Sequence, residues 1–192
     1  MAANTLDQPR VALSPLALLA WSTIAGGALA LVGGIPLASF EAAAQPPWWV
    51  PVLNAVSHLL VLLGVVGLLR SGAAGRGRLA ASGLWLTILG LAVNILAEFA
   101  WLTGTSAFDA LLGISVLAIT LGLILAGAAM VRGGRWTGWQ RFTLLACGLY
   151  IPLVVLPAFA LPGLLPHYAI GGWGVCWLLI GVRQLAEARP EA

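Results

Sequence analysis

The sequence predicts an all-α fold, a polytopic bundle of six transmembrane helices that forms a single domain over residues 1–192. One observation behind this prediction is composition, because 61% of the residues are hydrophobic and only 8% are charged. Soluble domains carry about 25% charged residues, so this chain has too few to cover a surface that faces water. A second observation is the presence of apolar runs close to the ~20 residues that a helix needs to cross a bilayer.

The third observation is the position of the basic residues, all nine of which are arginine. Arg10 lies before the first apolar run, and Arg183 and Arg189 lie at the end of the sixth. The others lie between the second and third runs (Arg70, Arg76 and Arg78) and between the fourth and fifth (Arg132, Arg135 and Arg141). Basic residues keep short loops in the cytoplasm, so this alternation predicts cytoplasmic N- and C-termini. The net charge of +3 is therefore a topology signal, and nucleic-acid binding is not expected.

We expect the spans at approximately 13–34, 49–69, 79–102, 108–131, 142–161 and 167–186. The first run is too long for the core of a signal peptide. Residues 42–44 are all alanine and offer a small-residue cleavage site, but a retained first helix is the better interpretation.

Tryptophans mark the expected boundaries of several spans. Trp48 and Trp49 precede the second span, Trp101 lies near the end of the third, and Trp136 and Trp139 precede the fifth. An indole ring is apolar but its N–H prefers a polar partner, which suits the membrane–water boundary. We therefore expect all five side chains at the two interfaces.

Small residues recur every four positions in the first and fourth spans. The two stripes are Gly26, Ala30 and Gly34, and Ala118, Gly122 and Ala126. Small residues on one helical face let two backbones approach closely in lipid. These stripes predict helix packing within the monomer, with homodimerisation as the alternative.

The fifth span contains two prolines, Pro152 and Pro157, and Pro162 lies at its end. Each interior proline removes one backbone hydrogen bond and kinks or loosens the helix. Because lipid cannot satisfy the freed carbonyl groups, this stretch should face other helices or a wet cavity. A bent outer half of the fifth helix is therefore expected.

Polar residues within the spans are few and are spaced in pairs. Asn54 and His58 share one face of the second span, and Asn94 and Glu98 share one face of the third. If the two spans run antiparallel about a turn near residue 75, the two pairs differ in depth by only about 4.5 Å. All four side chains would then meet in the outer half of the membrane. Asp109 begins the fourth span on the same side.

The polar residues have two interpretations. In the first, Asn54, His58, Asn94, Glu98 and Asp109 form an outward-facing ligand pocket, with Glu98 as its acid and His58 as a proton acceptor or ligand-orienting group. Such a pocket would bind a cation, a quinone-like or lipid head group, or relay protons. In the second, favoured interpretation, the amides, the acid and the imidazole satisfy one another and set the register of two helices.

No cofactor or metal is expected. The two histidines, His58 and His167, differ in depth by about 14 Å, too far to clamp one haem. If the fifth and sixth spans run antiparallel about a turn near residue 164, Cys147 and Cys176 differ in depth by about 9 Å. This separation is too large for a disulfide, so we expect none. We interpret both cysteines as small apolar core residues. No third ligand completes a zinc site.

The chain resembles a loose group of uncharacterised small bacterial integral membrane proteins with six helices. The resemblance rests on the outer Pro/Trp segment, the leucine-rich stretch that begins at His58, the Arg/Gly turn, and the Gly/Leu-rich helix that ends near Glu98 and Phe99. Arg135 and Trp136, which open an inner segment before Gly148, add to it. The group implies a six-helix fold in the bacterial cytoplasmic (inner) membrane and supplies no substrate.

Two functions remain open at this stage. The first is a non-enzymatic accessory, scaffold or sensor protein, which sparse ionisable groups and short loops favour. The alternative is a small transporter or ligand-binding bundle that uses the pocket at Asn54, His58, Asn94 and Glu98. An enzyme would need more converging polar groups than the chain offers. The expected partners are the lipid bilayer, an unidentified small ligand, and a membrane-protein partner or a second copy.

Overall fold

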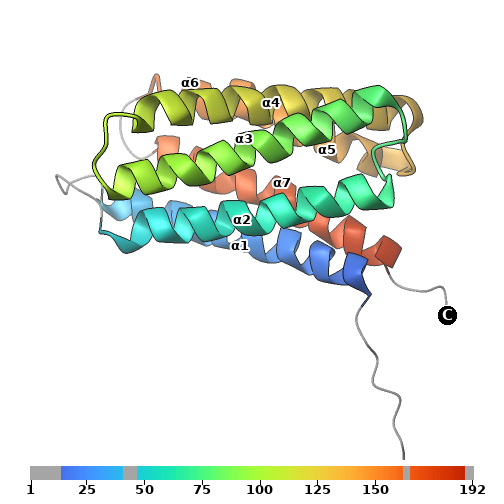
Figure 1. Cartoon of the computed structure of the whole chain (residues 1–192), viewed down its shortest axis with the longest axis horizontal. Helices are drawn as coiled ribbons and strands as arrows, with labels where there is room; N and C mark the ends of the chain where they lie inside the picture. The colour runs from blue at the N-terminus through green and yellow to red at the C-terminus, as the bar shows by residue number, and fades with distance from the viewer. Residues whose placement is uncertain (1–13, 41–46, 162–164, 189–192) are drawn as a thin grey trace, which may run out of the picture.

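A computed structural model describes residues 14–40, 47–161 and 165–188 (Figure 1). The long helices are α1 (Pro15–Phe40), α2 (Trp49–Ser71), α3 (Arg78–Leu102), α4 (Phe108–Gly133) and α7 (Leu165–Ala188). With the interrupted segment Gly138–Ala158 they provide six helices that are long and apolar enough to cross a membrane. The predicted all-α fold is thus confirmed, and the part of the chain that the structure describes contains the six expected helices of membrane-spanning length and apolar character. Arg10, Arg189 and the alanines at 42–44 lie outside the described residues.

The fifth span is interrupted, as its prolines predicted. It consists of η1 (Gly138–Phe142), α5 (Thr143–Tyr150), a π-helical turn η2 (Ile151–Val155) and α6 (Leu156–Ala158). In η2 the Leu156 N–H donates to the Ile151 carbonyl oxygen, five residues back. Proline lacks the N–H that a regular α-helix needs at this point, and a local π turn is one way to accommodate the loss.

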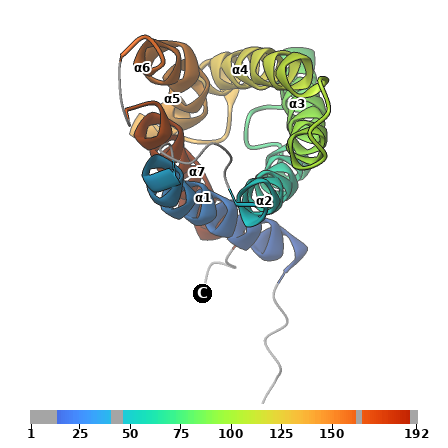
Figure 2. The same cartoon turned by 90° about the vertical axis from the view of Figure 1, so that its left-hand side faces the viewer.

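The helices form a ring in which each helix packs against its neighbours in sequence and α7 closes the ring against α1 (Figure 2). The most extensive pairings are α1 with α7 and α3 with α4. Side chains from around the ring fill the centre, among them Leu84 of α3, Leu123 of α4 and Trp177 of α7. The outward faces carry exposed apolar residues such as Leu117 and Trp85, which suits a surface that faces lipid.

Glycines set the closest helix approaches. Gly26 of α1 packs against Ser57 and Val61 of α2, while Gly122 of α4 packs against Thr87 and Gly83 of α3. The small-residue stripes therefore pack helices within the chain, as predicted. At each of these positions a methyl group would collide with the backbone of the neighbouring helix.

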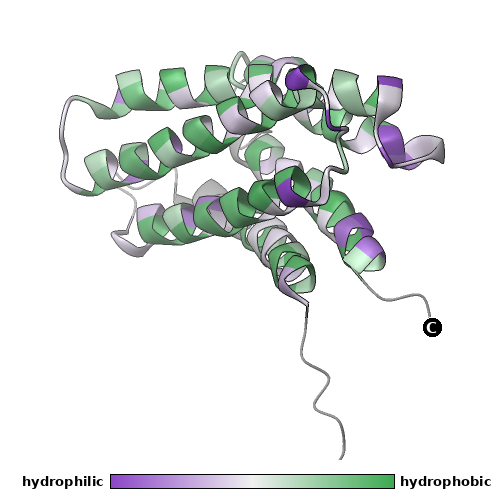
Figure 3. Cartoon of the chain, turned by 45° about the vertical axis from the view of Figure 1, so that its right-hand side comes forward, coloured by the Kyte–Doolittle hydropathy of each residue, from purple (hydrophilic) through white to green (hydrophobic). Residues whose placement is uncertain are grey.

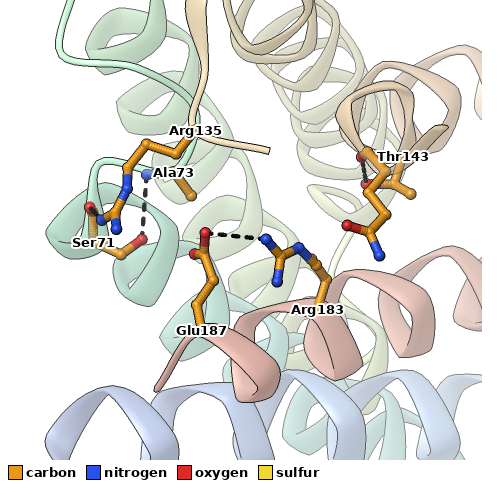
Figure 4. Close-up of polar contacts among 7 residues, drawn as sticks. Ser71, Ala73, Arg135, Thr143, Arg183 and Glu187 are labelled. Carbon is orange, nitrogen blue, oxygen red and sulfur yellow. Dashed lines mark hydrogen bonds and ion pairs between the residues drawn. The ribbon is translucent and has the colours of Figure 1, made fainter. Parts of the chain in front are cut away.

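The strongly hydrophilic residues lie mostly at one end of the bundle, which carries the loops after α2 and α4 and the last turns of α7 (Figure 3). At this end the Arg135 N–H donates to the Ala73 carbonyl oxygen at 2.9 Å. Arg135 Nη1 donates to the Ser71 carbonyl oxygen at 3.0 Å (Figure 4). Arg183 and Glu187 form an ion pair at 3.6 Å on α7. The Arg135 contacts join the loops that follow α2 and α4. We call this end of the bundle, with Arg70, Arg78, Arg132, Arg135 and Arg183, the arginine end.

One interface prediction is wrong. Trp136 is only 2% exposed and belongs to the hydrophobic core, whereas Trp139 is 65% exposed as expected for a boundary residue. The loop after α4 folds back onto the bundle and carries the Trp136 indole inward, and Arg183 lies over its ring at 5.8 Å. Proximity to arginines in sequence therefore indicated the correct end of the bundle but the wrong orientation of this side chain.

Candidate ligand-binding groove

A groove of about 200 Å³ lies between the N-terminal half of α2 and the C-terminal half of α3. Its lining residues are Pro51, Val52, Ala55, Val56, Leu59, Ile95, Glu98, Phe99 and Leu102. Glu98 is the one polar residue among them. This half of the bundle is the one opposite the arginine end, since Arg70 and Arg78 occupy the other ends of the same two helices.

The groove opens toward the surroundings of the bundle. Val56, Leu59 and Phe99 on its walls are 43%, 48% and 53% exposed. Walls of exposed apolar side chains are stable where the solvent is lipid. If the bundle lies in a bilayer, a molecule dissolved in the lipid could enter the groove laterally, without passing through water.

Glu98 combines deep burial with an unpartnered oxygen. The residue is 7% exposed, and its Oε2 atom has no hydrogen-bond partner. The side-chain amide of Asn54 on α2 lies close enough to interact with the carboxyl group. A buried carboxyl oxygen without a donor costs free energy comparable to a lost hydrogen bond, and more when the group is ionised. Glu98 Oε2 therefore lacks a hydrogen-bond donor in the groove.

Asn94, one turn before Glu98 on α3, leaves a second oxygen unpaired. Its Nδ2 donates to Ser115 Oγ on α4 at 2.9 Å, and Ser115 Oγ donates in turn to the Leu112 carbonyl oxygen at 2.7 Å. The Oδ1 atom of Asn94 is buried without a partner. The same half of α3 therefore carries two buried acceptors that no described side chain satisfies.

His58 makes its contact within its own helix. Its Nδ1 lies 2.8 Å from the Asn54 carbonyl oxygen. A carbonyl oxygen only accepts, so we infer that Nδ1 carries the proton, which leaves Nε2 of the neutral ring as an acceptor. His58 is not among the residues that line the groove.

The structure brings together part of the predicted cluster. Asn54 and Glu98 meet across α2 and α3, whereas Asn94 turns to Ser115 on α4. Asp109 is exposed in the first turn of α4, where the helix dipole favours a negative charge, and it does not line the groove.

Sequence reasoning missed a second polar network, which joins α1, α2 and α7. Thr23 Oγ1 donates to Gln184 Oε1 at 2.7 Å, and Gln184 Nε2 donates to the Gly64 carbonyl oxygen at 2.9 Å. All three residues are buried. The sequence did contain an indication of this network, because Gln184 is a polar residue within the last apolar run. Nothing in the sequence identifies its partners.

The predicted separation of the cysteines is also wrong. The thiols of Cys147 on α5 and Cys176 on α7 lie within hydrogen-bonding reach of each other, and both are free. The predicted difference in depth required regular fifth and sixth helices that are joined by a turn centred near residue 164. Instead, η2 interrupts the fifth span and α6 already ends at Ala158, which shifts the residue that lies level with Cys147.

The groove offers a single acidic group inside an apolar slot. Among the described residues, no three histidine, cysteine, aspartate or glutamate side chains lie close enough to hold a metal ion. Comparisons of the chain with protein families, curated proteins and solved structures found no match.

Proposed function

We propose that the protein is a non-enzymatic membrane protein that binds a small amphiphile in the groove between α2 and α3. The observation that carries this proposal is the carboxyl group of Glu98, with its Oε2 unpartnered, in an otherwise apolar groove of about 200 Å³. An apolar cavity with a few placed polar groups is the usual form of a small-molecule site.

The size of the groove limits what it holds. Sites that enclose a drug-sized ligand measure about 300–1,000 Å³, more than the roughly 200 Å³ found here. The groove therefore takes the head group and the first carbons of a ligand, while the rest of the chain remains in the bilayer. This geometry suits a lipid-soluble molecule with one apolar tail.

The accessory or scaffold role is the second candidate. It is favoured over transport by the packed hydrophobic core, to which Leu84, Leu123 and Trp177 all belong. In this role a membrane-protein partner or a second copy would lie against the exposed apolar faces.

Filling the groove should abolish binding. We expect Ala55→Trp, whose indole would occupy the groove, to reduce binding by about 10-fold or more. The measurement is photocrosslinking of a diazirine analogue of dodecanol to protein in phosphatidylcholine nanodiscs, with crosslinked peptides identified by mass spectrometry. Leu89→Trp, on an exposed part of α3 outside the groove, is the matched control. Equal labelling of α2 and α3 in both variants would refute the groove as a binding site.

We further propose that the protein resides in a bacterial cytoplasmic membrane with both termini and the arginine end in the cytoplasm, as the arginine pattern predicts. The groove then opens in the outer half. In a variant without native cysteines, Gly77→Cys at the arginine end should resist a membrane-impermeant maleimide in intact cells, while Thr105→Cys, exposed in the loop between α3 and α4, should react. Reaction of Gly77→Cys in intact cells would reverse the orientation.

A further inference from the structure

The groove has the chemistry of a cation site. Resting on the proposed function, we infer that its ligand is a single-chain amphiphile with a protonated amine as its head group. The head group must satisfy the oxygen that the fold leaves unpaired in the groove, Glu98 Oε2.

The unpaired oxygen of the groove calls for a donor. Glu98 is 7% exposed, so its Oε2 atom cannot rely on water. A hydroxyl head group supplies one donor, whereas a primary ammonium supplies three. The ammonium can therefore bond to the carboxylate and still offer donors to other oxygens along α3.

The charge balance points the same way. No arginine lines the groove, and Arg70 lies 15 residues from Ala55 along α2, a distance of about 22 Å. Among the residues that the structure describes, the groove thus offers no arginine to pair with Glu98. A negatively charged head group would bring neither a donor nor an opposite charge to the carboxyl group, and a neutral one would bring no charge, whereas an ammonium would pair with the ionised form.

The groove also discriminates by shape. Its walls are apolar except for Glu98, so a bulky phosphate-bearing head group would lose its hydration without gaining donors. A compact ammonium on an alkyl chain presents its charge to the carboxylate and its methylene groups to Val56 and Phe99. Ordinary phospholipids are therefore poor ligands and single-chain amines are good ones.

The test compares dodecylamine, dodecanol and dodecanoate as competitors of the diazirine probe in phosphatidylcholine nanodiscs. Because a charged hydrogen bond contributes more than a neutral one, dodecylamine should compete about 10-fold to 100-fold better than dodecanol, and dodecanoate should compete least. Glu98→Gln, which keeps the shape, should lower dodecylamine to the level of dodecanol. Asp109→Asn, which removes an exposed acid outside the groove, should preserve the preference.

The outcomes separate this inference from the proposed function. If dodecanol competes as well as dodecylamine while Ala55→Trp blocks both, the ammonium assignment is wrong and the groove still binds ligand. If no competitor displaces the probe and Ala55→Trp changes nothing, both proposals fail.

A second measurement avoids dependence on the folding of Glu98→Gln. In the wild-type protein, dicyclohexylcarbodiimide should modify Glu98 from the bilayer, as mapped by mass spectrometry. Dodecylamine should slow that modification at least ~10-fold more than dodecanol does. Equal protection by the two compounds would overturn the ammonium assignment.

Discussion

Replacing Gly122 with leucine is expected to separate α3 from α4 and to destabilise the whole bundle. A Cβ atom at Gly122 would lie 2.6 Å from the Thr87 backbone nitrogen and 2.7 Å from the Gly83 carbonyl oxygen. Backbone atoms of a helix cannot move aside as a flexible side chain can, so the helices must part. We expect a loss of about 3 kcal/mol or more and a midpoint of thermal unfolding in detergent about 10 °C lower.

The same helix provides the control. Gly113 has no atom within 4 Å of the position where a Cβ would lie, and leucine there should change stability by no more than about 0.5 kcal/mol. The Gly113→Leu variant introduces the same side chain into the same helix. If both variants unfolded at the same temperature, the close approach of α3 and α4 would not be a determinant of stability.

Replacing Trp136 with alanine should have the second large effect. The indole is almost completely buried against the core at the arginine end, and its loop is held there by the hydrogen bond between the Arg135 N–H and the Ala73 carbonyl oxygen. Truncation of a buried tryptophan typically costs about 3–5 kcal/mol. Thermal unfolding followed by circular dichroism measures the loss.

Trp139 is the matched position, since it lies three residues later and is 65% exposed. Trp139→Ala should leave the unfolding midpoint nearly unchanged in detergent. A larger loss at Trp139 than at Trp136 would restore the boundary role that the sequence suggested for Trp136.

The spans could be predicted because hydropathy measures the quantity that decides them, the free energy of moving a side chain out of water. Hydropathy does not distinguish lipid from the interior of a protein. Trp136 illustrates this limit, because an indole between arginine and threonine suits a membrane boundary as well as a buried position. The first span ends at Gly34, as expected, and α1 continues beyond it as a helix to Phe40.

The candidate site was predictable only where the helices are regular. Depth counting along α2 and α3 correctly brought Asn54 to Glu98, because both helices keep a constant rise per residue. The same counting failed for Cys147 and Cys176, where prolines interrupt the fifth span. The partner of Asn94 depends on how α3 is rotated about its axis, and that rotation follows from the packing of Gly83 on Ala126, which no single-helix pattern contains.

The closed ring has a consequence for biosynthesis. Among the described helices, α1 finds its most extensive partner in α7, which follows it by more than 120 residues, so this pairing cannot form until α7 has been synthesised. During that interval the face of α1 that carries Gly27, which packs against Gly174 of α7, is unoccupied, and a chain truncated before α7 would keep it so. A chaperone or protease that surveys nascent membrane proteins could recognise that face as the mark of an unfinished chain.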